Sequence, residues 1–119
     1  MNFDKIEREC IAVAKCSSHK TFNIGAVLVA KGSIVATACN LAGTTGGLEN
    51  KFSGHAEARL LDSPPAIAAK GAEVYVLRLA KSGKLSMARP CPSCQHWLEL
   101  REVSRCYYTD ELGIWQRLI

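Results

Sequence analysis

Two short clusters of reactive side chains constrain this chain more than any other feature. The first is His55-Ala56-Glu57, and the second is Pro90-Cys91-Pro92-Ser93-Cys94. Together they offer one imidazole and two thiolates as metal ligands, and one carboxylate that coordination does not require. Three protein ligands leave one position open for water, as in hydrolytic zinc sites, whereas a structural zinc site takes a fourth protein ligand. The fold is therefore expected to bring both clusters to one metal ion.

Neither cluster is specific by itself, because His and Glu meet at this spacing by chance and C-x-x-C also occurs in redox sites. Their conjunction, in this order and with a proline on each side of Cys91, is far more specific. The pattern H-x-E…P-C-x-x-C resembles the signature of the zinc-dependent cytidine/deoxycytidylate deaminase superfamily. The resemblance implies Zn²⁺ held by His55, Cys91 and Cys94, with Glu57 as the catalytic acid and base.

The reaction that this resemblance implies is the hydrolytic deamination of cytosine to uracil. Glu57 would accept a proton from water, pass it to a ring nitrogen and help to protonate the departing ammonia. Backbone N–H groups near Ala56 and Cys91 would orient the carbonyl group of the base.

Three further residues are expected to contact the substrate. Asn40 ends a predicted strand, where members of the family place an Asn that contacts the sugar, although an Asn also commonly serves a turn. Phe52 would stack on the base or, alternatively, fill the core beneath its loop. Arg89 would hold a phosphate or be simply solvated, as would the other basic residues nearby, Arg78, Lys81 and Lys84.

Both clusters are expected at helix N-termini, each arriving from a loop. The partial positive charge of a helix N-terminus stabilises anions, so Cys91 and Cys94 are expected to bind the metal as thiolates. Positions i and i+3 lie on one face of a helix, so both sulfur atoms can reach one ion. Pro92 suits the first helical turn, where its missing N–H costs nothing.

The order of predicted elements is α-β-β-α-β-α-β. Helices are expected over residues 3–18, from about Gly54 to the Pro64-Pro65 pair, and from about 92 to 102. Strands are expected over 24–30, 34–39, 74–79 and 105–108, with a turn at 31–33 and loops at 41–53 and 80–89. We therefore predict an α/β fold, a three-layer α-β-α sandwich of the cytidine deaminase type with a mixed sheet of about five strands.

The chain is expected to end in a short antiparallel hairpin. A parallel strand after Tyr108 would need a crossover of a dozen or more residues, and too few remain. A compact end of this kind resembles the free-nucleoside cytidine deaminases, whereas the ligand His55 resembles the deoxycytidylate and nucleic-acid branches. The two cues conflict, and they leave open the phosphate, the sugar and the size of the substrate.

Length and composition indicate one soluble domain spanning residues 1–119. The chain has 119 residues, of which 48% are hydrophobic and 22% charged, which is ordinary for a globular protein. No apolar run approaches the length of a membrane span, and the N-terminus has no signal-peptide pattern, so we expect a cytoplasmic protein with reduced thiols. The net charge of +4 suits a phosphorylated substrate and is too small to indicate nucleic-acid binding.

A second zinc site at Cys10, Cys16 and His19 is disfavoured, because helix residues six apart do not share a face. Packing or surface thiols are the expected roles of these cysteines.

Three function classes follow. The leading one is a deaminase of cytosine in a free (deoxy)cytidine nucleoside or nucleotide. The second is a deaminase of cytosine or adenosine in single-stranded DNA or RNA, for which little chain remains to build a strand-binding groove. The third is a zinc-stabilised interaction module without turnover, which would have no need of Glu57. The small sheet, Trp97 and Trp115, and the short C-terminal edge favour a homo-oligomer, a dimer or larger, with no membrane partner.

Overall fold

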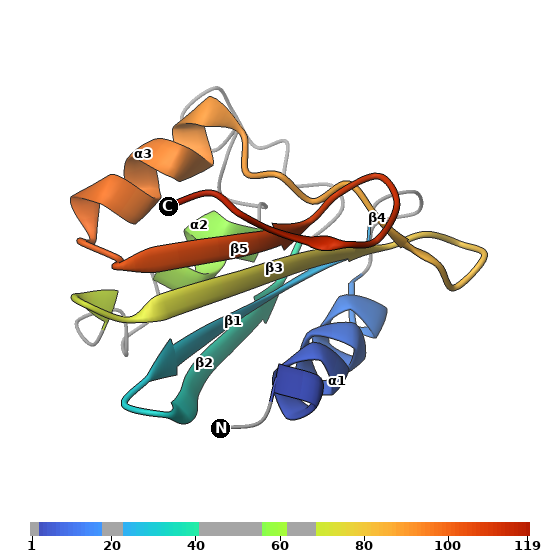
Figure 1. The fold of residues 1–119 in the computed structure, drawn as a ribbon, viewed down its shortest axis with the longest axis horizontal. Coiled ribbons are helices and arrows are strands. Elements are labelled where there is room, and N and C mark those ends of the chain that lie inside the picture. The colour runs from blue at the N-terminus through green and yellow to red at the C-terminus, as the bar shows by residue number, and fades with distance from the viewer. Residues whose placement is uncertain (1–2, 18–22, 41–55, 62–68) are drawn as a thin grey trace.

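The structure, a computed structural model, describes residues 3–17, 23–40, 56–61 and 69–119 (Figure 1). Its helices are α1 (Phe3–Lys15), α2 (Ala56–Leu61) and α3 (Pro92–Leu100). Its strands are β1 (Asn23–Ala30), β2 (Ser33–Cys39), β3 (Glu73–Leu79), β4 (Leu85–Ser86), β5 (Arg105–Thr109) and β6 (Trp115–Arg117). The predicted α/β fold with a mixed sheet is confirmed.

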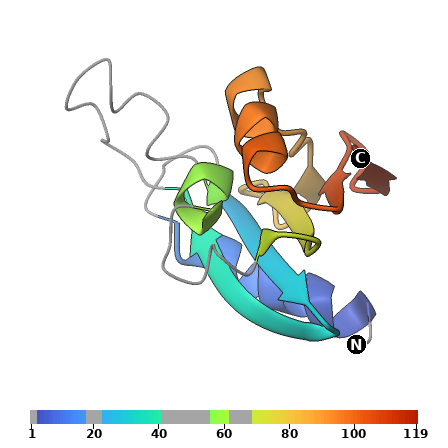
Figure 2. The same ribbon diagram turned by 90° about the vertical axis from the view of Figure 1, so that its left-hand side faces the viewer.

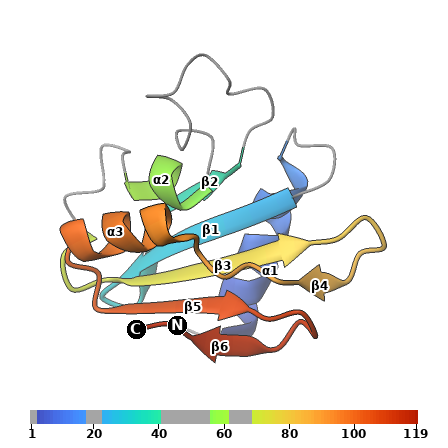
Figure 3. The same cartoon turned by 90° about the horizontal axis from the view of Figure 1, so that it is seen from above.

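The strands form one mixed sheet in the order β2-β1-β3-β5-β6, with β4 paired to β3. Strand β1 runs antiparallel to both β2 and β3, and β3 runs parallel to β5. Strands β2, β3 and β5 therefore point in the same direction, and their carboxyl ends lie at one end of the sheet (Figure 3). Helices α2 and α3 lie in the two crossovers between these parallel strands.

Alternation of side chains along the strands builds a core on each face of the sheet. On one face, Val27, Tyr75 and Leu77 pack against the apolar side of α1. On the other face, helices α2 and α3 cover a second set of strand residues, Ala26, Leu28, Val74, Val76 and Cys106. Successive residues of a strand point to opposite faces, so β1 and β3 each serve both cores. The result is the three-layer sandwich seen in Figure 2.

Helix α1 lies unusually close to β1 because residue 25 is a glycine. A Cβ atom at Gly25 would overlap the carbonyl oxygen of Cys10 and lie 2.8 Å from the nitrogen of Ala14. Both of those atoms belong to the backbone of α1, so no side-chain rotation could make room. Glycine is therefore required for this contact between helix and sheet.

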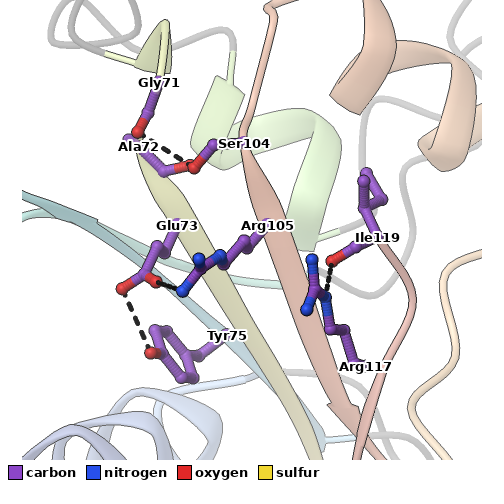
Figure 4. Close-up of polar contacts among 8 residues, drawn as sticks. All are labelled: Gly71, Ala72, Glu73, Tyr75, Ser104, Arg105, Arg117 and Ile119. Carbon is purple, nitrogen blue, oxygen red and sulfur yellow. Dashed lines mark hydrogen bonds and ion pairs between the residues drawn. The ribbon is translucent and has the colours of Figure 1, made fainter.

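The amino ends of β3 and β5 are tied together by Ser104 (Figure 4). Its hydroxyl contacts the carbonyl oxygens of Gly71 at 3.0 Å and Ala72 at 2.9 Å, and its backbone N–H donates to Ala72. The ion pair between Arg105 and Glu73, at 3.7 Å, is largely solvent-exposed and adds little. This end of the sheet lies opposite to the carboxyl ends of β3 and β5.

Several boundaries differ from those predicted. The basic loop predicted over residues 80–89 is wrong in part, because the chain turns at Gly83, which has φ of +88°, and returns as β4. Helix α1 ends at Lys15 rather than residue 18, where Cys16 N–H donates to Val13 three residues back. Helix α3 ends at Leu100 rather than near 102, because Glu102 adopts a left-handed conformation with φ of +58°.

The C-terminal hairpin is confirmed. Strand β6 pairs antiparallel with β5 through the turn at residues 110–114. Asp110 holds this turn by accepting hydrogen bonds from the backbone N–H groups of Leu112 and Ile114. Among the helices that the structure describes, none is long and apolar enough to cross a membrane.

Candidate metal centre

The cysteine pair lies where α3 begins, as predicted. Cys91 is the N-cap residue, with extended backbone angles of −68° and 165°, and Pro92 follows in the first turn. Cys94 is completely buried, whereas Cys91 is partly exposed. The N–H of Gln95 donates to the carbonyl oxygen of Cys91 at 2.9 Å, which is the first hydrogen bond of the helix. Cys91 therefore stands immediately before the first turn of α3 and Cys94 lies within that turn, at the positive end of the helix dipole.

The other cluster leads into α2. Ala56 is the first residue of this helix and is fully buried, together with Leu60 and Leu61. Helix α2 contacts α3, β1 and β2, so the helices that follow the two clusters pack side by side on one face of the sheet (Figure 1). His55 and the side chain of Glu57 lie outside the described residues.

The end of the sheet where these segments meet is the carboxyl end of β2, β3 and β5. Helix α3 follows β3 and β4 and returns to the start of the parallel strand β5, so its N-terminus must lie near the carboxyl end of β3. Ligand sites of open α/β sheets lie at this end.

The donor chemistry fits zinc. Two thiolates and one imidazole are ligands that Zn²⁺ accepts, and Cys91 and Cys94 lie at the start of one helix. Among the residues with described side chains, no three His, Cys, Asp or Glu gather closely enough to hold a metal. The third expected ligand, His55, falls outside that set. The structure therefore describes two of the three expected ligands, Cys91 and Cys94.

Asn40 stands directly after β2 and is buried, with 6% of its surface exposed. Its side-chain oxygen accepts hydrogen bonds from the backbone N–H of Ile24 at 2.9 Å and from the Ser17 hydroxyl at 2.6 Å. These bonds join the end of α1, the start of β1 and the end of β2. Asn40 therefore has a structural role that the sequence did not indicate, and its predicted contact with a sugar remains a prediction.

Of the other three residues predicted to contact the substrate, the structure describes Arg89 and Ala56. Arg89 is exposed and lies over the ring of Tyr108, 5.9 Å from the ring centroid. It stands two residues before Cys91, and its predicted contact with a phosphate remains a prediction. Phe52 lies outside the described residues. Ala56 is buried at the start of α2, and its predicted hydrogen bond to the base remains a prediction.

Cys10 in α1 and Cys16 directly after it have the surroundings predicted for packing and surface thiols. Cys10 is buried, and its thiol points to the carbonyl oxygen of Tyr75 at 3.8 Å. Burial, with Glu9 and Glu7 nearby, raises the pKa of the Cys10 thiol to about 12. Cys16 is exposed. His19 lies outside the described residues.

Two residues that bond to the segment before Cys91 carry no signal in the sequence. Thr109 is fully buried at the end of β5, and Gln95 donates its side-chain amide to the carbonyl oxygen of Pro90 at 2.8 Å. Neither residue belongs to a recognisable motif. Their importance depends on the return of the chain as β4, which was not predicted.

Comparison with known families identifies this arrangement. Residues 2–110 match the family model described as the cytidine and deoxycytidylate deaminase zinc-binding region. The chain belongs to this family. The match includes both clusters, so the helix starts described above lie in the zinc-binding region of a cytidine and deoxycytidylate deaminase family member. A search of curated proteins found no match.

Solved structures agree with this membership. The dCMP deaminase of the cyanophage S-TIM5 is 25% identical, with a TM-score of 0.67 and 96% of each chain covered. The cytidine deaminase of Burkholderia pseudomallei is 22% identical, with a TM-score of 0.70, 98% of this chain covered and 91% of that one. RibD of Acinetobacter baumannii is 21% identical, with a TM-score of 0.59, and the match covers 87% of this chain but 26% of RibD. The latter two matches show the fold.

Proposed function

We propose that this protein is a zinc-dependent hydrolase that deaminates cytosine to uracil in a free (deoxy)cytidine nucleoside or nucleotide. The observation that carries the proposal is the meeting of α2 and α3 on one face of the sheet. Their starts carry the thiol pair and the segment His55-Ala56-Glu57. Family membership and the similarity to a dCMP deaminase support the same chemistry.

His55, Cys91 and Cys94 would hold the zinc ion. When bound, zinc supplies Lewis-acid activation of a water molecule. The two thiolates balance the charge of the ion and weaken that activation, so a neighbouring base is needed.

Glu57 is the proposed base, because it stands two residues from His55 and coordination does not require it. Its carboxylate accepts a proton from water and delivers it to the ring nitrogen next to the reacting carbon. The oxygen of water bonds to this carbon, the bond to the exocyclic nitrogen breaks, and ammonia leaves with a proton carried by Glu57. Water and cytosine thus become uracil and ammonia.

Substrate contacts are proposed for Asn40, Phe52, Ala56 and Arg89. Arg89 is the candidate for a phosphate, since it is a basic, exposed residue two positions before Cys91. Asn40 is the candidate for the sugar, at the carboxyl end of β2. Phe52 and the backbone N–H of Ala56 would contact the base.

A substrate panel tests this proposal. Purified protein is incubated with cytidine, deoxycytidine, their mono- and triphosphates, and a cytosine-containing oligonucleotide, and ammonia release is measured. We expect turnover of at least one monomeric substrate and none of the oligonucleotide. Turnover of the oligonucleotide alone would favour the polynucleotide deaminase, and zinc binding without turnover of any substrate would favour the interaction module.

A further inference from the structure

Thr109 is a fully buried polar residue that the proposed chemistry does not use. Among the described residues, only Asn40 and Thr109 are polar and buried to this degree. Buried hydroxyl groups need hydrogen-bond partners, and the identity of those partners shows what the residue holds in place.

Besides its ladder pairing with Trp115 of β6, Thr109 bonds to the chain that leads to the cysteine pair and to β3 beside it. Its hydroxyl group donates a hydrogen bond to the carbonyl oxygen of Ser86 at 2.6 Å. The same hydroxyl oxygen accepts a hydrogen bond from the backbone nitrogen of Arg78 at 3.4 Å. Its backbone carbonyl oxygen accepts the N–H of Ala88 at 2.8 Å. Thr109 therefore joins the end of β5 to β3, to β4 and to the residue two positions after β4.

This junction forms because β4 pairs with the end of β3 beyond the last residue that pairs with β5. Strand β1 pairs with β3 along all of residues 73–79. On the other side of β3, β5 pairs only as far as Val76, and β4 takes Arg78 and Leu79. The segment 85–90 thus begins in the sheet as β4, leaves it at the carboxyl ends of β3 and β5, and runs from there to the start of α3 (Figure 3).

Gln95 holds the last residue of the same segment, Pro90. Its side-chain amide donates to the carbonyl oxygen of Pro90 at 2.8 Å, and its backbone N–H donates to that of Cys91 at 2.9 Å. Pro90 itself is fully buried. The segment that leads to Cys91 is therefore held at three residues. Thr109 bonds to Ser86 and Ala88, and Gln95 bonds to Pro90.

We propose that Thr109 and Gln95 are positioning residues that place Cys91 for metal binding and so set the zinc affinity. This inference rests on the proposed function, because it takes Cys91 and Cys94 as zinc ligands. Residues that orient metal ligands through hydrogen bonds typically change metal affinity about 10–100-fold when replaced. A fold-stabilising threonine would change only the free energy of unfolding.

The test compares zinc affinity, by competition with a chromophoric chelator, and the free energy of unfolding of the zinc-free protein. Thr109→Val removes the hydroxyl with little change of shape, and Thr109→Ser keeps it. Ser104→Ala is the matched control, because Ser104 makes the same kind of hydroxyl-to-carbonyl bonds at the opposite ends of β3 and β5. Gln95→Met removes the other contact and is the second variant if Thr109→Val does not fold.

We expect Thr109→Val and Gln95→Met each to weaken zinc binding by about tenfold or more. Thr109→Ser and Ser104→Ala are expected to bind zinc as the unaltered protein does. The absorption spectrum of the Co²⁺-substituted protein should change in the first pair and not in the second. Unchanged zinc affinity in Gln95→Met and Thr109→Val, or equal weakening in Ser104→Ala, would overturn the inference. Absence of zinc binding by the unaltered protein would overturn the proposed function instead.

Discussion

At the scale of single residues, Cys10 in α1 and Cys16 directly after it differ in their surroundings. Cys10 is buried between α1 and the sheet, and burial raises the pKa of its thiol to about 12. Because thiolates rather than thiols react with alkylating reagents, Cys10 stays inert near neutral pH. Cys16 is exposed in the turn directly after α1.

We predict that iodoacetamide labels Cys16 in the native protein much faster than Cys10. Peptide mapping by mass spectrometry after a short exposure at about pH 8 measures both sites, and the denatured protein, in which both react, is the control. Rapid labelling of Cys10 in the folded state would contradict its placement in the core.

Asp110 is a second residue whose surroundings have a measurable consequence. The N–H of Ile114, with the Gln116 amide and the N–H of Leu112, stabilises the carboxylate and lowers the pKa of Asp110. A carboxyl group with a lowered pKa adds stability above its ordinary pKa, about 3.9, and that stability disappears as the pH falls through the lower value in the folded protein.

We therefore expect acid to destabilise the unaltered protein more than Asp110→Asn below about pH 4. Thermal melting across this range measures the difference, which should be small because the carboxylate is exposed. Melting curves that shift in parallel for both proteins would show that the carboxylate does not stabilise the turn.

At the scale of elements, the contact of α1 with β1 depends on Gly25. A methyl group there would collide with the backbone of α1 at Cys10 and Ala14, so the helix must move away from the sheet. Overpacking of this kind costs about 1–3 kcal/mol. We expect Gly25→Ala to lower the free energy of unfolding by that amount in urea titrations. A variant as stable as the unaltered protein would show that α1 does not lie this close to the sheet.

The elements also show how far the sequence could predict the fold. Apolar periodicity predicted α1, which carries one buried face, and continuous apolar runs predicted β1 and β3, which are buried on both faces of the sheet. The antiparallel β6 followed from the few residues left after Tyr108. Strand β4 was missed because two residues carry no periodic signal, and its pairing depends on β5 leaving β3 free beyond Val76.

The candidate site could be predicted only in part, because motif spacing identifies the ligands but not the residues that hold their backbone. Cys91 and Cys94 were recognised from motif spacing, which also gave their place at the start of α3. Thr109 and Gln95 could not be recognised in this way. Their role follows from hydrogen bonds to backbone atoms of the segment 85–90, which begins with β4. Asn40 was predicted to contact the sugar of the substrate. Its bonds to Ile24 and Ser17 could not be predicted, because they join elements far apart in the sequence.

At the scale of the whole molecule, we predict a homo-oligomer. Large apolar side chains remain exposed near the C-terminal hairpin, among them Leu112 at 79%, Ile114 at 55% and Ile119 at 40%. Burying such surface in an interface is favourable. Light scattering at micromolar concentration should give a dimer or larger. A monomer at that concentration, still active on dilution, would contradict this prediction.

The central claim is that a zinc site built on α2 and α3 deaminates cytosine with Glu57 as its proton carrier. The most direct measurement is the cytosine-to-uracil turnover of Glu57→Gln, alongside zinc content and melting temperature. This variant keeps the shape of the side chain and removes its basicity, and general acid/base catalysis contributes about 10²–10⁴-fold. We predict loss of activity by at least that factor, with about one zinc per chain and the fold retained. Near-normal turnover with zinc bound would contradict the role of Glu57, and loss of zinc would show that Glu57 is a ligand.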